Sequence, residues 1–116
     1  MYPPKLSKRA CVADAQSASG YNYFQYKTFN AISHEAARNL LERDASWTKW
    51  TRVPRYIKVE IEVWVNNQLA EQNIPRIRED VFDWRMARAL PDAARAASNV
   101  RDGAVHDTDA TATPTD

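Results

Sequence analysis

Residues 56–65 read Y-I-K-V-E-I-E-V-W-V, and the conformation of this segment decides which fold class the chain can adopt. Every second residue from position 57 to position 65 is Ile or Val, which is the period-two pattern of a strand. However, one helical face would carry Ile57, Ile61, Trp64 and Val65, and the following N-N-Q-L-A-E-Q favours helix. We therefore predict a helix, and we keep as the alternative an α+β fold with residues 56–65 as a strand.

The rest of the chain also favours helices. It contains only two Gly in 116 residues, which leaves few sites for tight turns. Residues 34–43 carry the most regular helical pattern, with Ser33 as the expected N-cap and Glu35 in the first turn. Further helices are predicted over residues 21–30, over residues 47–51, from Pro54, and from Pro75 to Pro91. The expected fold is a small, mainly α domain.

Composition divides the chain into three parts. Residues 1–19 combine Pro, Lys and Arg with small side chains, and we predict a basic disordered leader there. Residues 98–116 hold four Asp among Thr and Ala, which predicts an acidic disordered tail. A single helical domain is therefore expected over residues 20–97.

Positive charge is segregated in one place only, the segment S-W-T-K-W-T-R-V-P-R-Y-I-K at residues 46–58. Lys49, Arg52, Arg55 and Lys58 occur there without an acidic residue, although the whole chain is nearly neutral, with 16 Lys+Arg and 15 Asp+Glu. A local excess of cations among aromatic residues is typical of a surface that binds a polyanion, here duplex DNA. The alternative is structural: solvated cations beside two Trp that anchor a small core.

The sequence offers little to catalysis, cofactors or metals. His34 and His106 have no second His at metal-ligand spacing, and the acidic residues near position 80 are interleaved with Arg. No Gly-rich phosphate loop and no recognised nucleophile motif occur, so we expect no catalytic residue, cofactor or metal. With one cysteine, Cys11, and neither a signal peptide nor a membrane-spanning segment, we expect a soluble cytoplasmic protein.

Residues 24–72 resemble small helix-turn-helix regulators of the phage repressor and Cro type. The first helix of the motif would be I-S-H-E-A-A-R-N-L-L, the turn E-R-D, the recognition helix A-S-W-T-K-W, and the return helix would begin within R-V-P-R-Y-I-K. The resemblance implies that Ala37 and Leu41 pack the two motif helices together. It further implies that Ser46, Trp47 and Lys49 face the major groove while Thr51, Arg52 and Arg55 contact phosphate.

This resemblance implies a DNA-binding regulatory protein of a phage, plasmid or other mobile element. We expect such a regulator to act as a homodimer, because two-fold symmetry doubles the contacts that a small domain can make.

Two other functions compete with DNA regulation. The chain could be a small adaptor or inhibitor that binds a host protein through exposed aromatic side chains, namely Tyr21, Tyr23, Phe24 and Tyr26. Binding of RNA or single strands by stacking on Trp47, Trp50 and Tyr56 would need a β platform, so it depends on residues 56–65 being a strand.

Overall fold

A computed structural model describes residues 6, 7 and 9–106 of the chain. Its elements are α1 (Val12–Ser19), α2 (Tyr23–Arg43), the 3₁₀ turn η1 (Trp50–Arg52), α3 (Arg55–Glu71) and α4 (Glu79–His106). The described residues contain no strand, so the prediction of a mainly α fold is confirmed and the α+β alternative is wrong.

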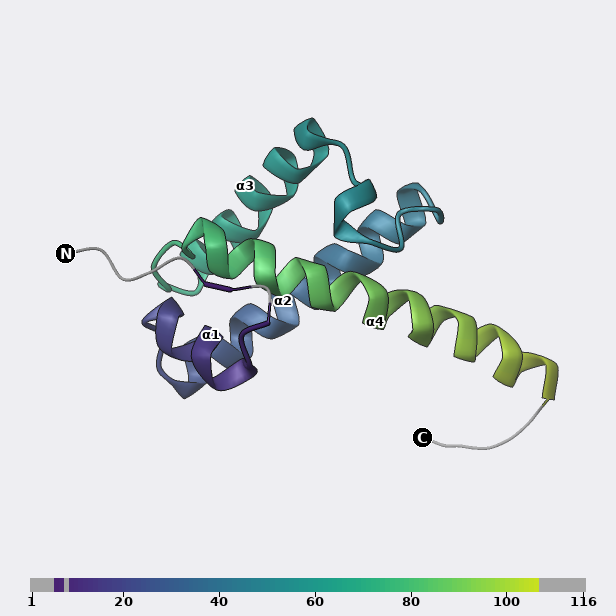
Figure 1. The fold of residues 1–116 in the computed structure, drawn as a ribbon, viewed down its shortest axis with the longest axis horizontal. Coiled ribbons are helices and arrows are strands. Elements are labelled where there is room, and N and C mark those ends of the chain that lie inside the picture. Colours follow the sequence, from purple (N-terminus) through teal and green to yellow (C-terminus); the bar gives the residue numbers. More distant parts are fainter. Residues whose placement is uncertain (1–5, 8, 107–116) are drawn as a thin grey trace.

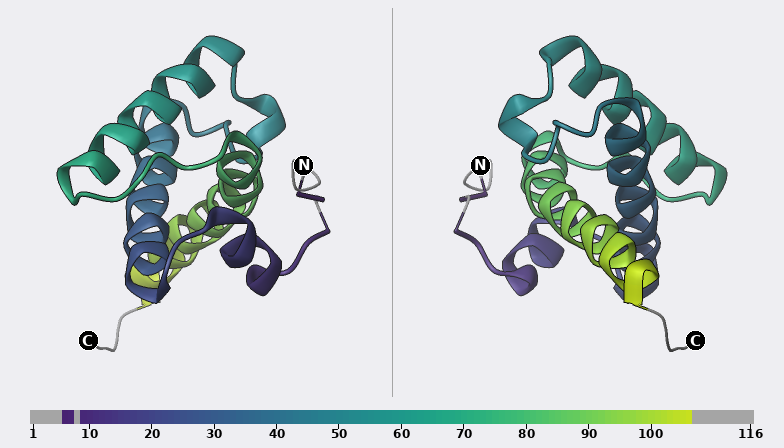
Figure 2. Two further views of the ribbon diagram at one scale, coloured as in Figure 1. Left: turned by 90° about the vertical axis from the view of Figure 1, so that its left-hand side faces the viewer. Right: turned by 90° about the vertical axis from the view of Figure 1, so that its right-hand side faces the viewer.

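Helices α2 and α4 form the centre of the molecule, with α3 on one side of this pair and α1 on the other (Figures 1 and 2). The shared core contains Phe29 and Leu40 from α2 and Phe82, Met86 and Leu90 from α4. The C-terminal part of α4 projects beyond the other helices (Figure 1). No described helix has the combination of length and apolarity that crossing a bilayer requires.

The segment with two competing patterns is helical because its buried side chains follow the helical period. Ile57, Ile61, Val65 and Leu69 recur every four residues and are all buried in α3. The intervening Val59 and Val63 are 45% and 52% exposed, so the apparent strand alternation divides between two faces of one helix. Pro54, predicted as the first residue of this helix, is instead its N-cap, so α3 begins one residue later, at Arg55.

Helix α2 is longer than predicted and starts elsewhere. Its N-cap is Asn22, whose Oδ1 accepts from the Gln25 backbone N at 2.8 Å, while Gln25 Oε1 accepts from the Asn22 N at 3.0 Å. The predicted cap, Ser33, instead lies inside the helix, fully buried, and its Oγ donates to the Phe29 carbonyl at 2.8 Å. Helix α2 therefore includes both of the helical patterns predicted at 21–30 and 34–43.

Helix α4 differs from its prediction at both ends. It begins at Glu79 rather than at Pro75, and it continues through Pro91 to His106. Proline removes one backbone hydrogen bond from a helix interior, but Leu90 and Ala93 are buried on either side of Pro91, and packing thus continues across it. Residues 98–106, which were predicted to belong to a disordered tail, lie in α4, and residues 107–116 lie outside the described part.

The described residues of the predicted leader pack on α4. Ala15 of α1 is fully buried and forms a small cluster with Ala10 and Trp84. The indole Nε1 of Trp84 donates to the Ala10 carbonyl at 3.0 Å. Gly20 ends α1 with a φ of 74°, a left-handed conformation that glycine adopts without strain.

Candidate functional site

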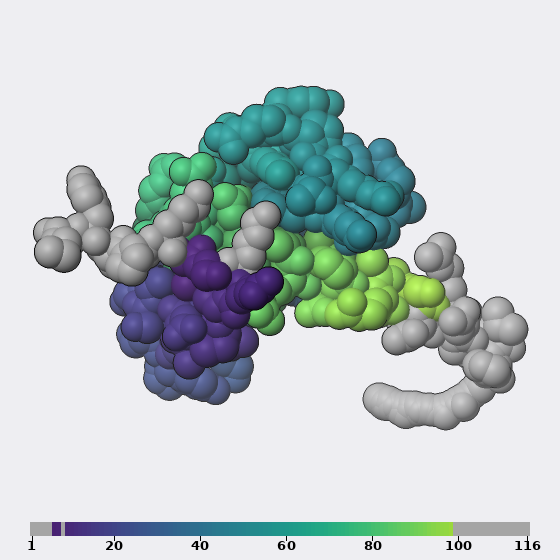
Figure 3. Space-filling view, viewed as in Figure 1, coloured from purple at the N-terminus to yellow at the C-terminus, as the bar shows by residue number. Residues whose placement is uncertain are grey.

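The loop between α2 and α3 carries most of the predicted DNA-contacting residues. Ser46, Lys49, Thr51 and Arg52 are exposed along it, and Arg55 is exposed as the first residue of α3. Figure 3 shows the surface of α3 and of this loop, in teal, uncovered by other described segments on the face in view. We use the name basic surface for Lys49, Arg52, Arg55 and Lys58.

The predicted recognition helix is not present in this loop, so a helix-turn-helix is not confirmed. Residues 45 and 46 form a turn, and between α2 and α3 only the three residues of η1 are helical. Asp44 stops α2 locally, because its Oδ1 accepts from the backbone N of Ser46 at 2.9 Å and from its Oγ at 2.6 Å. These hydrogen bonds from Ser46 lower the pKa of Asp44.

Both Trp residues of the segment pack against the protein core. Trp50 is buried, its indole Nε1 donates to Asp83 Oδ1 at 3.2 Å, and its ring packs edge-on against Phe82 at 5.6 Å. Trp47 is half-buried against the same core, so only part of its side chain is available for the predicted contact with the major groove. The structural alternative therefore holds for Trp50, whose indole fixes the loop that carries the cations.

The cations of the basic surface gather around the N-terminal end of α3. The first turn of α3 has no acidic residue, and the partial positive charge of the helix dipole adds to that of Arg55. Arg55 has one exposed partner, Glu79, at 3.9 Å, whereas Lys49 and Arg52 form no ion pair within the described part of the chain. Lys58 Nζ lies 5.0 Å from the centre of the Trp50 ring.

An apolar stripe on the outer face of α3 adjoins the basic surface. Tyr56 is 72% exposed, and Val59 and Val63 continue the stripe toward the C-terminal end. Glu60 beside them is paired with Arg43 of α2 at 2.6 Å. Sequence reasoning missed this stripe, although the signal was present: Val59 and Val63 do not fit the face defined by Ile57, Ile61 and Val65.

The predicted aromatic partner surface is divided by the structure. Tyr21 and Tyr26 are buried in the core, so they are not exposed as predicted. The Tyr21 hydroxyl donates to the Pro75 carbonyl, and burial raises its pKa to about 12. Burial also raises the pKa of Tyr26. Tyr23 and Phe24 are 63% and 77% exposed and pack edge to face, with ring centres 5.5 Å apart.

The acidic residues near position 80 do not converge on one point. Asp83 accepts from Trp50, whereas Asp80 accepts from the backbone N of Leu6 at 2.8 Å and from Arg78 Nη2 at 2.6 Å. Within residues 6, 7 and 9–106, no three His, Cys, Asp or Glu side chains are grouped to hold a metal ion.

Comparison with protein-family models, curated proteins and solved structures finds no match to this chain. Function is therefore inferred from the chain's own residues and their geometry.

Proposed function

We propose that this protein binds duplex DNA through the basic surface. The observation that carries the proposal is the grouping of Lys49, Arg52 and Arg55 around the N-terminal end of α3 without an acidic residue in that turn. Side-chain cations and a helix N-terminus both attract phosphate, and together they provide the nonspecific part of DNA affinity. The resemblance to repressor- and Cro-type regulators makes transcription regulation in a mobile element, by a homodimer, the proposed role.

We propose further that α3 takes the place of the recognition helix expected at residues 45–50. Its outer face carries Tyr56, Val59 and Val63, whose apolar groups suit contact with thymine methyls. The major groove, about 12 Å wide, accepts one α-helix. In this arrangement Lys49 and Arg52 contact the phosphates that flank the groove.

Salt dependence tests the contribution of the basic surface. Affinity for a duplex is measured by fluorescence anisotropy at several salt concentrations for the wild type and for a triple variant, Lys49→Ala, Arg52→Ala and Arg55→Ala. Each lost phosphate contact should reduce the slope of log affinity against log salt by about 0.9. Lys27→Ala, which removes one exposed cation from α2, is the matched control and should leave the slope unchanged. Equal slopes for the wild type and the triple variant would refute the proposal.

The orientation of α3 has a separate test. Val63→Asp places a carboxylate on the outer face of α3, where it would meet the negative potential of the groove, so duplex affinity should fall more than tenfold. Ser17→Asp adds the same charge to an exposed position on α1 and should have little effect. If the two variants bind DNA equally well, α3 does not enter the groove.

A second candidate function, an adaptor for a host protein, is favoured by the exposed pair Tyr23 and Phe24. Exposed aromatic side chains are the residues that most often anchor protein interfaces. The double variant Tyr23→Ser and Phe24→Ser should lose a stoichiometric partner captured from nuclease-treated lysate, while the triple variant of the basic surface should keep it. If neither variant changes what is captured, this pair is not an interface.

A further inference from the structure

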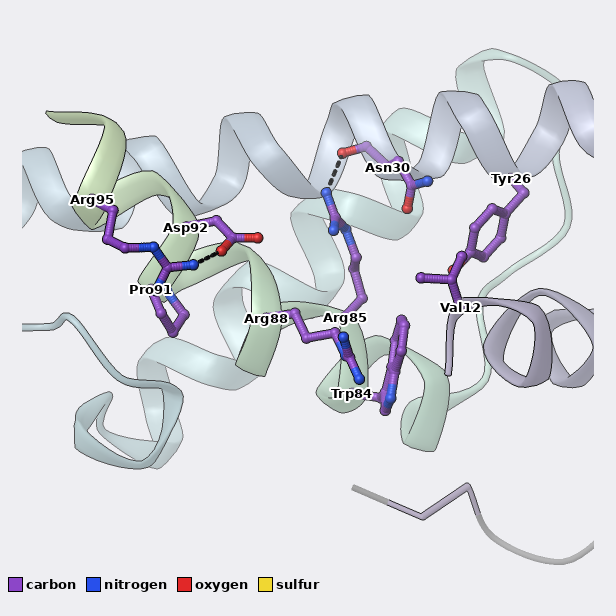
Figure 4. A pocket seen from close by; sticks show the side chains of 9 residues that line it. All are labelled: Val12, Tyr26, Asn30, Trp84, Arg85, Arg88, Pro91, Asp92 and Arg95. Atoms are coloured by element: carbon purple, nitrogen blue, oxygen red, sulfur yellow. Dashed lines mark hydrogen bonds and ion pairs between the residues drawn. The ribbon is translucent and has the colours of Figure 1, made fainter. Parts of the chain in front are cut away.

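A pocket of about 340 Å³ lies between α1, α2 and α4, and none of the residues so far proposed to bind DNA line it. Its polar lining consists mainly of Arg85, Arg88, Arg95, Asp92 and Asn30 (Figure 4). The α4 residues Phe82 and Asp83 contact Trp50 of η1, whereas Trp84 and Arg88 contact Ala10 ahead of α1. The pocket therefore belongs to a different face of α4 from the one that supports the basic surface.

The side chains that line the pocket carry a net positive charge. Three Arg and one Asp leave a net charge of +2, and the single carboxylate, Asp92, is already paired with Arg95. Arg85 is half-buried and donates only to neutral acceptors, to Ser33 Oγ at 2.7 Å and to the Asn30 carbonyl at 3.1 Å. Among the described residues no carboxylate forms an ion pair with Arg85 or Arg88.

A half-buried guanidinium without a direct ion pair is costly, because burial removes its hydration. Desolvation accordingly lowers the pKa of Arg85. An anion bound in the pocket would supply the missing charge. Arg88 is placed to share it, since its guanidinium is held over the Trp84 ring at 4.5 Å and donates through Nη2 to the Ala10 carbonyl at 2.9 Å.

Asn30 provides a second, independent feature of the same pocket. Its side-chain Oδ1 is buried and accepts no hydrogen bond within the described part of the chain. Figure 4 shows its side-chain amide directed from α2 into the space between Arg85 and Tyr26. A buried acceptor without a donor is unfavourable, so the pocket favours a ligand that carries a hydrogen-bond donor as well as an anion.

We propose that this pocket binds a small phosphate monoester that carries at least one hydroxyl group, with Arg85 and Arg88 on the phosphate oxygens and Asn30 Oδ1 accepting from the hydroxyl. A phosphate monoester carries about −1.5 to −2 charges at neutral pH, which matches the pocket, whereas a monocarboxylate neutralises only one. The pocket volume of about 340 Å³ leaves room for an organic group beside the phosphate. Tyr26, Trp84 and Val12 would cover the organic part of the ligand.

Isothermal titration calorimetry on the full chain tests the proposal with ribose 5-phosphate as the probe and ribose as its matched control. Ribose 5-phosphate should bind and ribose should not. Arg88→Ala should weaken binding at least tenfold, and Arg52→Ala on the basic surface should leave it unchanged. Absence of binding by ribose 5-phosphate, or equal binding of ribose, would overturn the proposal.

Arg88 also contacts Ala10 and Trp84, so a second variant separates ligand binding from folding. Asn30→Asp keeps the size of the side chain and places a carboxylate beside Arg85, where it should pair internally and exclude the phosphate. The melting temperature should be maintained while affinity for ribose 5-phosphate falls at least tenfold. If this variant folds and binds as tightly as the wild type, the pocket is not the site.

The phosphate could belong to a free metabolite or to the end of a nucleic acid strand. A short oligonucleotide with and without a 5′-phosphate distinguishes them, measured on the triple variant of the basic surface so that backbone contacts do not contribute. Tighter binding of the phosphorylated strand supports the pocket with a strand end as its ligand. Equal binding of the two strands, together with binding of ribose 5-phosphate, supports it with a free metabolite. Because the DNA-binding proposal rests on other residues, either proposal can fail while the other holds.

Discussion

Trp50 and Asp83 connect the loop before α3 to α4, through the hydrogen bond from the indole Nε1 to Oδ1 at 3.2 Å. The two residues are 33 positions apart in sequence, and the same indole packs against Phe82. Lys49 and Thr51 are the sequence neighbours of this buried ring, so its position also fixes theirs. The cations proposed to contact DNA are thus held by an anchor that itself does not touch DNA.

Asp83→Ala should destabilise the fold by about 1–3 kcal/mol, because a largely buried indole N–H loses its acceptor. Urea unfolding followed by tryptophan fluorescence measures the loss. Asp83→Asn is the control, since its amide oxygen can still accept from the indole, and it should cost less. An equal loss in both variants would show that the hydrogen bond does not anchor the loop.

Leu40 and Leu41 form a matched pair of neighbours with different burial. Leu40 of α2 is fully buried in the core, whereas Leu41 is half-buried at the edge of the core. Leu40→Ala should cost about 2–5 kcal/mol in unfolding free energy by opening a cavity, and Leu41→Ala should cost less. Chemical denaturation of both variants tests this order, and a larger loss for Leu41 would contradict the packing of α2.

The parts of the fold that sequence predicts well are those fixed by local pattern. Ile57, Ile61 and Val65 fit both a strand and a helix, and the helix-favouring residues that follow them, N-N-Q-L-A-E-Q, support the correct choice of α3. The recognition helix expected at residues 45–50 fails because burial of Trp50 against Phe82 and Asp83 overrides local helix propensity. No local pattern reveals that contact between residues distant in sequence.

The candidate sites also differ in whether they depend on a local sequence pattern or on contacts between distant residues. The basic surface is visible in sequence because its cations occur at every third position from Lys49 to Lys58, and the structure leaves three of the four exposed. The phosphate pocket was not predicted, since Asn30 and Arg85 are distant in sequence and only the crossing of α2 and α4 brings them together. Arg85 reads from sequence as an ordinary solvated residue on a helix surface.

Asp80 should make stability depend on pH in the acid range. Burial alone would raise its pKa, but hydrogen bonds from the Leu6 backbone and Arg78 outweigh burial and lower it. A carboxyl whose pKa is lower in the folded state stabilises the fold above its unfolded pKa of about 3.9, and this contribution is lost as the pH falls through the folded value. Urea unfolding of the wild type at pH 7 and at pH 3 should therefore show a loss of stability on acidification.

Asp80→Asn isolates this contribution. The variant should be less stable than the wild type at pH 7. The wild-type carboxylate accepts hydrogen bonds from the Leu6 backbone N and from Arg78, whereas one of the two polar atoms of the Asn side chain is itself a donor. The difference should shrink at pH 3, where the wild-type carboxyl is increasingly protonated. Asp92→Asn removes a carboxylate from the exposed side of α4 and is the control. A difference that stays constant with pH would exclude Asp80 as its source.

Deletion of residues 1–19 should lower the melting temperature, whereas a disordered leader would leave it unchanged. The deletion removes the Ala10 carbonyl that accepts from Trp84 and Arg88, the Leu6 N–H that donates to Asp80, and the packing of Ala15. Hydrogen bonds of this kind contribute about 0.5–1.5 kcal/mol each, and 1 kcal/mol corresponds to about 4–8 °C in a domain of this size. Differential scanning calorimetry of the deletion variant and the full chain measures the shift.

A matched pair of point variants tests the same contact in the full-length chain. Ala15→Asp introduces a charge at a fully buried position of α1 and should reproduce much of the loss in melting temperature. Ala13→Asp adds the same charge two residues away at an exposed position and should leave the melting temperature nearly unchanged. Equal melting temperatures for both variants, together with no effect of the deletion, would mean that α1 does not dock on α4 and that folding of the domain begins after residue 19.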